Sequence, residues 1–149
     1  MNIIQTIEPE AVNSVKVDNR LEIIDMAVDS GASETVIGEE MLQSVQTKEG
    51  DASRRGVQYE VANGVRIPNL GEKRFKGHTV EGMARNLTAQ VCEVNKALLS
   101  VKRVVQAGNK VVFDADGSYI EDKSTGEKMW LREENGMYML RMWVKTEGF

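Results

Sequence analysis

A chain of 149 residues has the length of one domain and can bury a sizeable core. Its net charge of −4 provides no overall positive field, so neither nucleic acid nor an anionic membrane is an expected partner. No apolar run has the length of a membrane span. Cys92 is the only cysteine, which excludes a disulfide within the chain and indicates a reducing, cytoplasmic compartment.

Residues that could ligate a metal are scattered along the sequence. No set of His, Cys or carboxylate residues has the spacing of a metal site, so neither a metal nor another cofactor is expected. The only histidine, His78, lies in a polar stretch typical of a strand end or a turn. We therefore expect His78 at the surface rather than in a catalytic site.

The first third of the chain predicts strands with one short helix. Residues 1–14 are predicted to form a flexible N-terminal arm. Residues 15–28 contain two β-rich runs around Asp18-Asn19-Arg20, which predicts a hairpin. Residues 38–45 place their apolar side chains on one side of a short helix, and the polar residues 47–56 are predicted to form a loop.

A second hairpin is predicted over residues 57–75. Apolar and polar residues alternate on both sides of Ala62-Asn63-Gly64, and these three residues favour a tight turn. Pro68 indicates an edge or a break in the returning strand. Residues 79–94 predict two more short strands, separated by 82–86.

The helix with the strongest pattern is predicted over residues 97–107, followed by Gly108 just past its end. Four further strands follow, over 111–113, 118–121, 128–131 and 137–144. The chain is therefore predicted to be mainly β, with one or two short helices. We expect one domain over 15–110, and C-terminal strands over 111–149 that pack on it or extend it.

An apolar run leads directly into Asp29-Ser30-Gly31, and this junction is the main functional feature of the sequence. Alone, the tripeptide is ordinary turn chemistry. Its flanks favour a functional role over a simple turn. The preceding strand is apolar on both faces apart from Asp25, and the chain becomes apolar again at Thr35-Val36-Ile37. Gly31 allows a tight turn, and the Ser30 hydroxyl can lock it. A carboxylate held rigidly in this position can activate water, provided that a second carboxylate faces it.

With its flanks, Asp29-Ser30-Gly31-Ala32-Ser33 resembles the active-site signature of retropepsin-type aspartic proteases. More specifically, the chain resembles the protease of Copia-type retrotransposon polyproteins, from about Ile23 to the C-terminus. The resemblance also rests on Ala62-Asn63-Gly64, Leu98-Leu99-Ser100-Val101, 111–117 and 135–140. One departure is Ser100, because viral retropepsins usually have glycine after the apolar doublet.

The resemblance implies a closed β-barrel half that forms a twofold homodimer, with extra C-terminal strands. Each chain lends one aspartate to a shared site, and the hairpin forms a flap over the substrate. On this basis Asp29, Ser30 and Gly31 would be the catalytic residues. Substrate would be bound by Ala32 and Ser33 beside the cleft and by the flap residues Val61, Ala62, Asn63 and Gly64.

The implied activity is aspartic endopeptidase cleavage of a polyprotein, with water activated by a pair of Asp29 carboxylates across the homodimer. The chain has one Asp-Ser-Gly and is too short for two lobes, so a working site needs a second copy. Two adjacent carboxylates cannot both be ionised, so the pair shares one proton. For Asp25 and Glu34, the simpler roles of solvated charge or turn support are preferred.

Two other functions are compatible with the sequence. The first is a catalytically inactive relative, which would serve as a dimeric binding or scaffold domain with the same fold. The second is a nucleic-acid-binding module from the same polyprotein. The acidic balance and an aromatic content of 5% count against that module.

Overall fold

The computed structural model describes residues 21–145, and strands dominate this range. Within these residues, nine strands form one mixed sheet, two form a separate hairpin, and there are two short helices. The main sheet contains β1 (Leu21–Asp29), β2 (Val36–Gly38), β5 (Gly71–His78), β6 (Ala84–Cys92), β7 (Ala97–Ser100), β8 (Asn109–Val112), β9 (Ser118–Asp122), β10 (Lys128–Glu134) and β11 (Met137–Lys145). The hairpin consists of β3 (Gln58–Glu60) and β4 (Arg66–Pro68), and the helices are α1 (Asp51–Arg54) and α2 (Val101–Gln106). The prediction of a mainly β chain with one or two short helices is confirmed.

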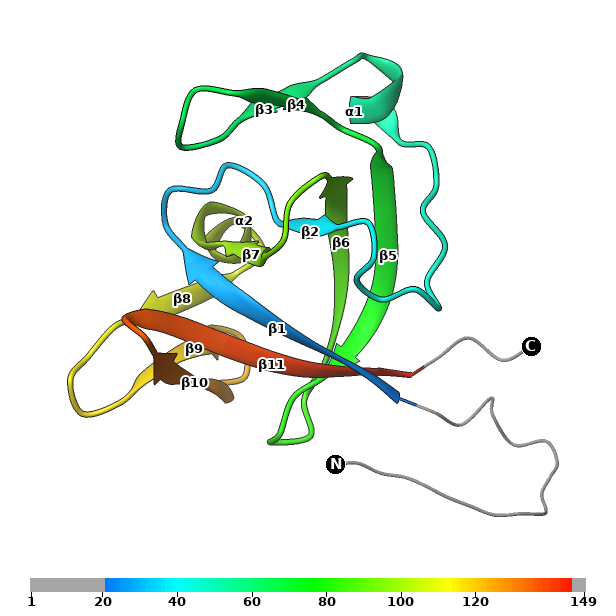
Figure 1. Cartoon of the computed structure of the whole chain (residues 1–149). Helices are drawn as coiled ribbons and strands as arrows, with labels where there is room; N and C mark the ends of the chain where they lie inside the picture. Colours follow the sequence, from blue (N-terminus) through cyan, green and yellow to red (C-terminus); the bar gives the residue numbers. More distant parts are fainter. Residues whose placement is uncertain (1–20, 146–149) are drawn as a thin grey trace, which may run out of the picture.

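The main sheet partly closes into a ring. Its strand order is β1-β7-β2-β6-β5-β11-β10-β9-β8, and β11 pairs with β1 as well as with β5. Figure 1 shows β1 and β11 side by side, from opposite ends of the sequence. Because β11 completes the ring, the C-terminal strands are part of the same sheet as the strand that ends at Asp29. The predicted arm over 1–14 and the first run of the hairpin over 15–28 lie outside the described residues.

The core lies inside this ring. Met26, Ile37, Val91, Leu99 and Met142 are each at most 2% exposed and come from five different strands. Burying one such side chain contributes about 1.5–3 kcal/mol. The end of β1 is anchored in this core, since Ile24, Met26 and Ala27 are all buried. The strand that carries Asp29 is therefore held rigidly.

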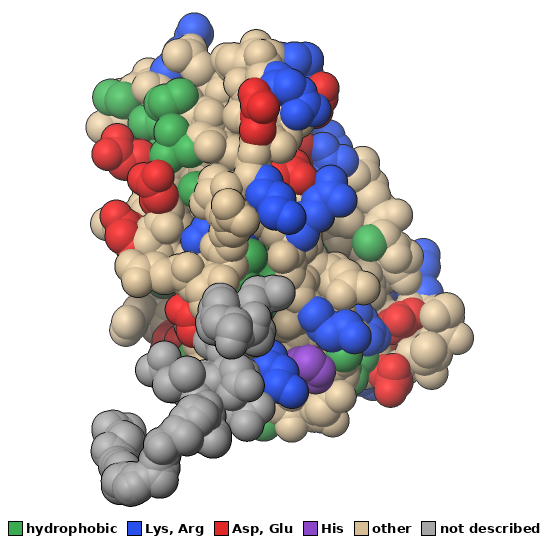
Figure 2. Space-filling view, turned by 90° about the vertical axis from the view of Figure 1, so that its right-hand side faces the viewer, with side chains coloured by type: hydrophobic (Ala, Val, Ile, Leu, Met, Phe, Trp, Pro, Cys, Tyr) green, Lys and Arg blue, Asp and Glu red, His purple; other side chains and the backbone are tan. Residues whose placement is uncertain are grey.

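Strand β5 shows the alternation expected for a sheet with one solvated face. Lys73 and Phe75 are buried, whereas Arg74, Lys76 and His78 are exposed. Lys and Arg side chains gather on the corresponding face of the molecule in Figure 2. The prediction that His78 lies at the surface is confirmed.

The helix predicted over 38–45 is wrong. This segment forms turns, and Leu42 has a φ of +54°, in the left-handed region. The Nζ of the buried Lys73 donates hydrogen bonds to the carbonyl oxygens of Met41 (2.7 Å) and Leu42 (2.9 Å). In a helix, backbone amides would donate to these carbonyl oxygens. Here the Lys73 ammonium, from a distant strand, is their donor instead.

The loop predicted over 47–56 is also partly wrong, because it contains the one-turn helix α1. Gly50 precedes this helix and Ser53 closes its first turn, with the Gly50 amide donating to the Ser53 hydroxyl (2.9 Å). Arg55 and Asp51 form an ion pair along the helix (2.9 Å). The segment is polar, and no residue of α1 is buried. Local hydrogen bonds and an ion pair, rather than an apolar face, therefore stabilise this helical turn.

Two strands were expected within 79–94, but the structure has only β6 there. The residues before it form a turn, in which the amide of Gly82 donates to the carbonyl of Thr79 (2.9 Å) and φ of Gly82 is +87°. The turn joins β5 to β6, which pair along their whole length from Gly71–Val91 to His78–Ala84. The predicted break at 82–86 therefore lies slightly later in the chain than the turn, and its last residues belong to β6.

The helix predicted over 97–107 begins four residues later than expected. Ala97–Ser100 forms β7, parallel to β1 and antiparallel to β2, and α2 starts at Val101. Leu98 shares helical spacing with Val101 and Val104, but pairing in the sheet outweighs that spacing, since the other three residues of β7 are buried. The predicted hairpin around Ala62-Asn63-Gly64 and the four C-terminal strands are confirmed, with shifted ends.

Candidate active site

Asp29 is the last residue of β1, and its backbone pairs in parallel with Ser100 of β7. The chain turns immediately after it. The Gly31 amide donates a 2.8 Å hydrogen bond to Oδ1 of Asp29 and closes this turn. The predicted lock by the Ser30 hydroxyl is wrong: Ser30 is exposed and makes no hydrogen bond within this turn, which the Gly31 amide closes instead. The carboxylate is held at the end of a rigid strand, as the sequence predicted.

Ser100 connects the loop after Asp29 to helix α2. Its hydroxyl donates to the carbonyl oxygen of Ala32 (2.8 Å) and accepts from the amide of Arg103 (3.2 Å), which caps the helix. Its own amide donates to the hydroxyl of Thr35 (3.1 Å). The side chain is fully buried. The departure from glycine at this position therefore adds a cap and a brace.

An ion pair supports the same loop from outside. Arg103 of α2 donates from Nε to Oε1 of Glu34 (3.1 Å), and a second contact joins its Nη2 to Oε2. Hydrogen bonding to Glu34 raises the pKa of Arg103. Glu34 thus lies beside the predicted site as a support for the turn. Asp25, four residues earlier on β1, pairs instead with Arg141 of β11 (2.8 Å).

Asp29 opens onto a cleft of about 490 Å³ between the ring and the hairpin β3–β4. In Figure 1 the hairpin lies above the end of β1 as a separate layer. The cleft brings together six of the nine predicted site residues: Asp29, Gly31, Ala32, Ser33, Val61 and Ala62. Ser30, Asn63 and Gly64 do not line it. Asn63 and Gly64 form the exposed tip of the hairpin, where Asn63 Oδ1 accepts from the amide of Val65 (3.1 Å).

The apolar floor and roof of the cleft come from residues that the sequence analysis did not assign to a site. They are Val36, Tyr59, Ile67, Cys92, Val94 and Leu98. The alternation of Tyr59 with Val61 could have placed both on one face of the hairpin. Nothing in the sequence connects this face to Cys92. Burial raises the pKa of the Cys92 thiol.

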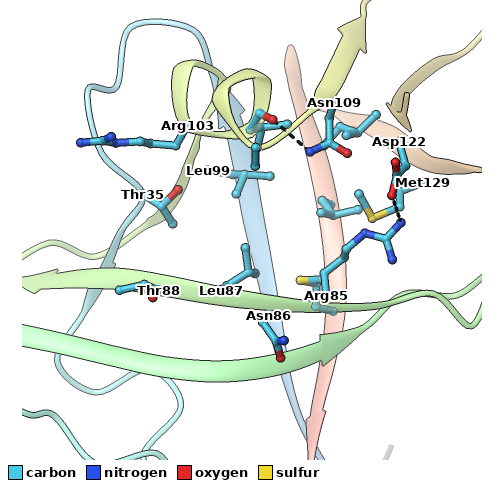
Figure 3. Close-up of a pocket in the computed structure, with 15 residues that line it drawn as sticks. Thr35, Arg85, Asn86, Leu87, Thr88, Leu99, Arg103, Asn109, Asp122 and Met129 are labelled. Carbon is cyan, nitrogen blue, oxygen red and sulfur yellow. Dashed lines mark hydrogen bonds and ion pairs between the residues drawn. The ribbon is translucent and has the colours of Figure 1, made fainter. Parts of the chain in front are cut away.

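A second cavity, of about 320 Å³, lies on the other side of the sheet, between α2, β6 and the C-terminal strands. Figure 3 shows Leu87, Leu99 and Met129 at this cavity, with Arg85 reaching Asp122 (3.1 Å). It contains no residue of the Asp29–Ser33 turn. The cavity therefore lacks the aspartate-containing turn that makes the cleft the candidate site.

Within residues 21–145 no group of three or more His, Cys, Asp or Glu side chains is arranged to hold a metal ion. None of the helices in this range is long and apolar enough to cross a membrane. No protein-family model, no curated protein and no solved structure matches the chain.

Proposed function

We propose that this chain is an aspartic endopeptidase whose Asp29 carboxylate acts together with Asp29 of a second copy. The observation that carries the proposal is the position of Asp29: it ends a strand that is anchored in the core, accepts a hydrogen bond from the Gly31 amide, and lines a cleft. A hairpin covers this cleft, and its apolar walls suit the side chains of an extended peptide.

The proposed site needs two copies. Within residues 21–145, Asp29 is the only aspartate that lines the cleft. The two glutamates there are engaged by arginines: Glu34 pairs with Arg103, and Glu60 lies 3.9 Å from Arg66. A twofold axis beside Asp29 would place two carboxylates together, and such a pair holds one proton. The ionised carboxylate takes a proton from a bridging water. The protonated one donates a hydrogen bond to the scissile carbonyl.

The finer fold assignment is part of the same proposal. The ring of strands would be one half of a retropepsin-type barrel dimer, with β8, β9 and β10 as an extension beyond it. The proposed retroelement origin and the polyprotein substrate rest on the sequence resemblance, above all on Asp29-Ser30-Gly31-Ala32-Ser33 and Ala62-Asn63-Gly64.

The test compares wild type with Asp29→Asn on a peptide library between about pH 4 and about pH 7, across which an aspartate pair is expected to lose its shared proton. Asn has the same shape and cannot act as the base, so cleavage should fall about a thousandfold or more. Asp114→Asn, at an exposed turn between β8 and β9, is the matched control and should cleave like wild type. Analytical ultracentrifugation of all three proteins shows whether each of them is a dimer.

Cleavage by a dimer that depends on Asp29 and not on Asp114 supports the proposal. Equal cleavage by Asp29→Asn contradicts it. A folded dimer without any cleavage also contradicts it, and it favours the alternative of a dimeric binding or scaffold domain.

A further inference from the structure

The hairpin β3–β4 forms a sheet of its own and shares no strand pairing with the main sheet. Its two ends are joined at its base, where the Asn69 amide donates to the carbonyl of Val57 (2.9 Å). Next to it, the Leu70 amide donates to the carbonyl of Val91 on β6 (2.7 Å). The hairpin is thus connected to the ring through a narrow base, and side chains there decide its position.

The Asn69 side chain lies at this base and is 7% exposed. Its Oδ1 accepts from the amide of Gly71 (2.8 Å), which can only donate and therefore fixes which side of the amide group carries the oxygen. The Nδ2 group then faces two acceptors. It donates to the hydroxyl of Tyr59 (2.9 Å) and to Oε1 of Gln90 (2.8 Å).

These two acceptors belong to different parts of the molecule. Tyr59 is on β3 and lines the cleft, whereas Gln90 is on β6 in the ring. The backbone of Gln90 continues the connection, because its amide donates to the carbonyl of Thr35 (2.8 Å). Thr35 in turn accepts from Ser100, whose hydroxyl bonds to Ala32 in the turn after Asp29. Hydrogen bonds therefore run without interruption from the hairpin to the turn of the candidate site.

We propose that Asn69 is a positioning residue that holds the hairpin β3–β4 over the cleft through its simultaneous bonds to Tyr59 and Gln90. The inference rests on the proposed function, in which this hairpin covers the bound peptide. Asn69 acts through Tyr59 and does not itself line the cleft. The burial of Asn69 makes the arrangement specific, because an amide group that loses its partners there is not solvated in exchange.

Two variants test the connection from its two ends. Tyr59→Phe removes only the hydroxyl on the hairpin, and Gln90→Leu removes only the acceptor on the ring. Tyr119→Phe is the matched control, because Tyr119 lies on β9 against Trp130, away from the hairpin. Asn69→Ala removes both bonds, together with that from Gly71.

The first readout is amide hydrogen exchange over residues 57–69 in the absence of substrate, and it requires no activity. Exchange there should be about threefold to tenfold faster in Tyr59→Phe and Gln90→Leu, as expected for one lost hydrogen bond, and unchanged in Tyr119→Phe. The second readout is peptide cleavage, where KM should rise by a similar factor while kcat stays within about twofold. A general loss of stability would speed exchange throughout the ring as well.

Unchanged exchange over 57–69 in both folded variants overturns the inference, whether or not the protein cleaves peptides. Faster exchange confined to 57–69, with a raised KM, supports it. The wild-type protein could also prove to cleave no peptide while Tyr59→Phe and Gln90→Leu exchange faster over 57–69. That result would support the role of Asn69 and contradict the proposed function. If Asn69→Ala does not fold, Tyr59→Phe and Gln90→Leu still decide the question.

Discussion

The hydroxyl of Ser100 and the carbonyl oxygen of Ala32 are 2.8 Å apart, so helix α2 is bonded directly to the loop that follows Asp29. The same hydroxyl caps the helix by accepting from the amide of Arg103. One fully buried side chain thus fixes both a helix start and the loop of the candidate site. A glycine here would provide neither bond.

Ser100→Ala should lower both stability and activity. It leaves the carbonyl of Ala32 and the first turn of α2 without a partner, which should cost about 1–3 kcal/mol of unfolding free energy. Because the loosened loop follows Asp29, kcat should fall, and KM should rise as well since Ala32 and Ser33 line the cleft. Urea unfolding and peptide kinetics measure the two effects.

The control for this prediction is Ser124→Ala. Ser124 also makes a short hydrogen bond, to Asp122 (2.7 Å), but in an exposed turn far along the chain from Asp29. It should change neither kcat nor the unfolding free energy by a comparable amount. If Ser100→Ala retains the wild-type kcat, the hydroxyl does not position the loop.

Much of the fold could be predicted from local patterns. Alternation and the Ala62-Asn63-Gly64 turn gave the hairpin, and the apolar run before Asp29 gave β1. The errors arose where distant residues decide. Leu98 shares helical spacing with Val101, Val104 and Val105, yet it lies in a strand because β1 and β2 are available on either side of it. The pairing of β11 with β1 could not be read from any local pattern.

The site could be predicted only in part for a similar reason. A short motif identified Asp29 and its turn, because local chemistry determines that turn. Asn69 and Gln90 are ordinary polar residues in the sequence, and their roles exist only once β4 and β6 are brought together. Ser100 departs from the retropepsin pattern that the sequence resembles, but its bond to Ala32 spans 68 positions of the chain.

Asp25 and Arg141 connect the first and last described strands and give stability a dependence on pH. Arg141 donates to both carboxylate oxygens of Asp25, at 2.8 and 2.9 Å, and Arg132 lies 3.4 Å away. The hydrogen bonds from Arg141 lower the pKa of Asp25 below its ordinary value of 3.8. The folded state therefore releases this proton more readily than the unfolded state.

The resulting stabilisation should be fully present above about pH 4 and should be lost as the pH falls through the lowered folded pKa. The carboxylate is one-third exposed, so solvent screening limits the effect to about 1 kcal/mol or less. Asp25→Asn should remove this part of the acid sensitivity and should be less stable than wild type near pH 6. Urea unfolding of both proteins at about pH 6 and below about pH 4 measures the difference in unfolding free energy.

Asp116→Asn, in the exposed turn between β8 and β9, is the control for Asp25→Asn and should follow the wild-type pH dependence. An identical slope of stability against pH in Asp25→Asn and wild type would mean that the ion pair with Arg141 contributes nothing.

Lys73 offers a direct test of the segment that was wrongly expected to be helical. Lys73→Met keeps most of the apolar side chain but leaves the carbonyls of Met41 and Leu42 without their donor, at a cost of about 2 kcal/mol. Lys76→Met, on the exposed face of the same strand, changes the charge equally and should be nearly neutral. Urea unfolding compares the two variants, and hydrogen exchange over 38–45 should be faster in Lys73→Met alone. Equal stability of the two variants would show that the lysine does not hold this turn, since only its position distinguishes it from Lys76.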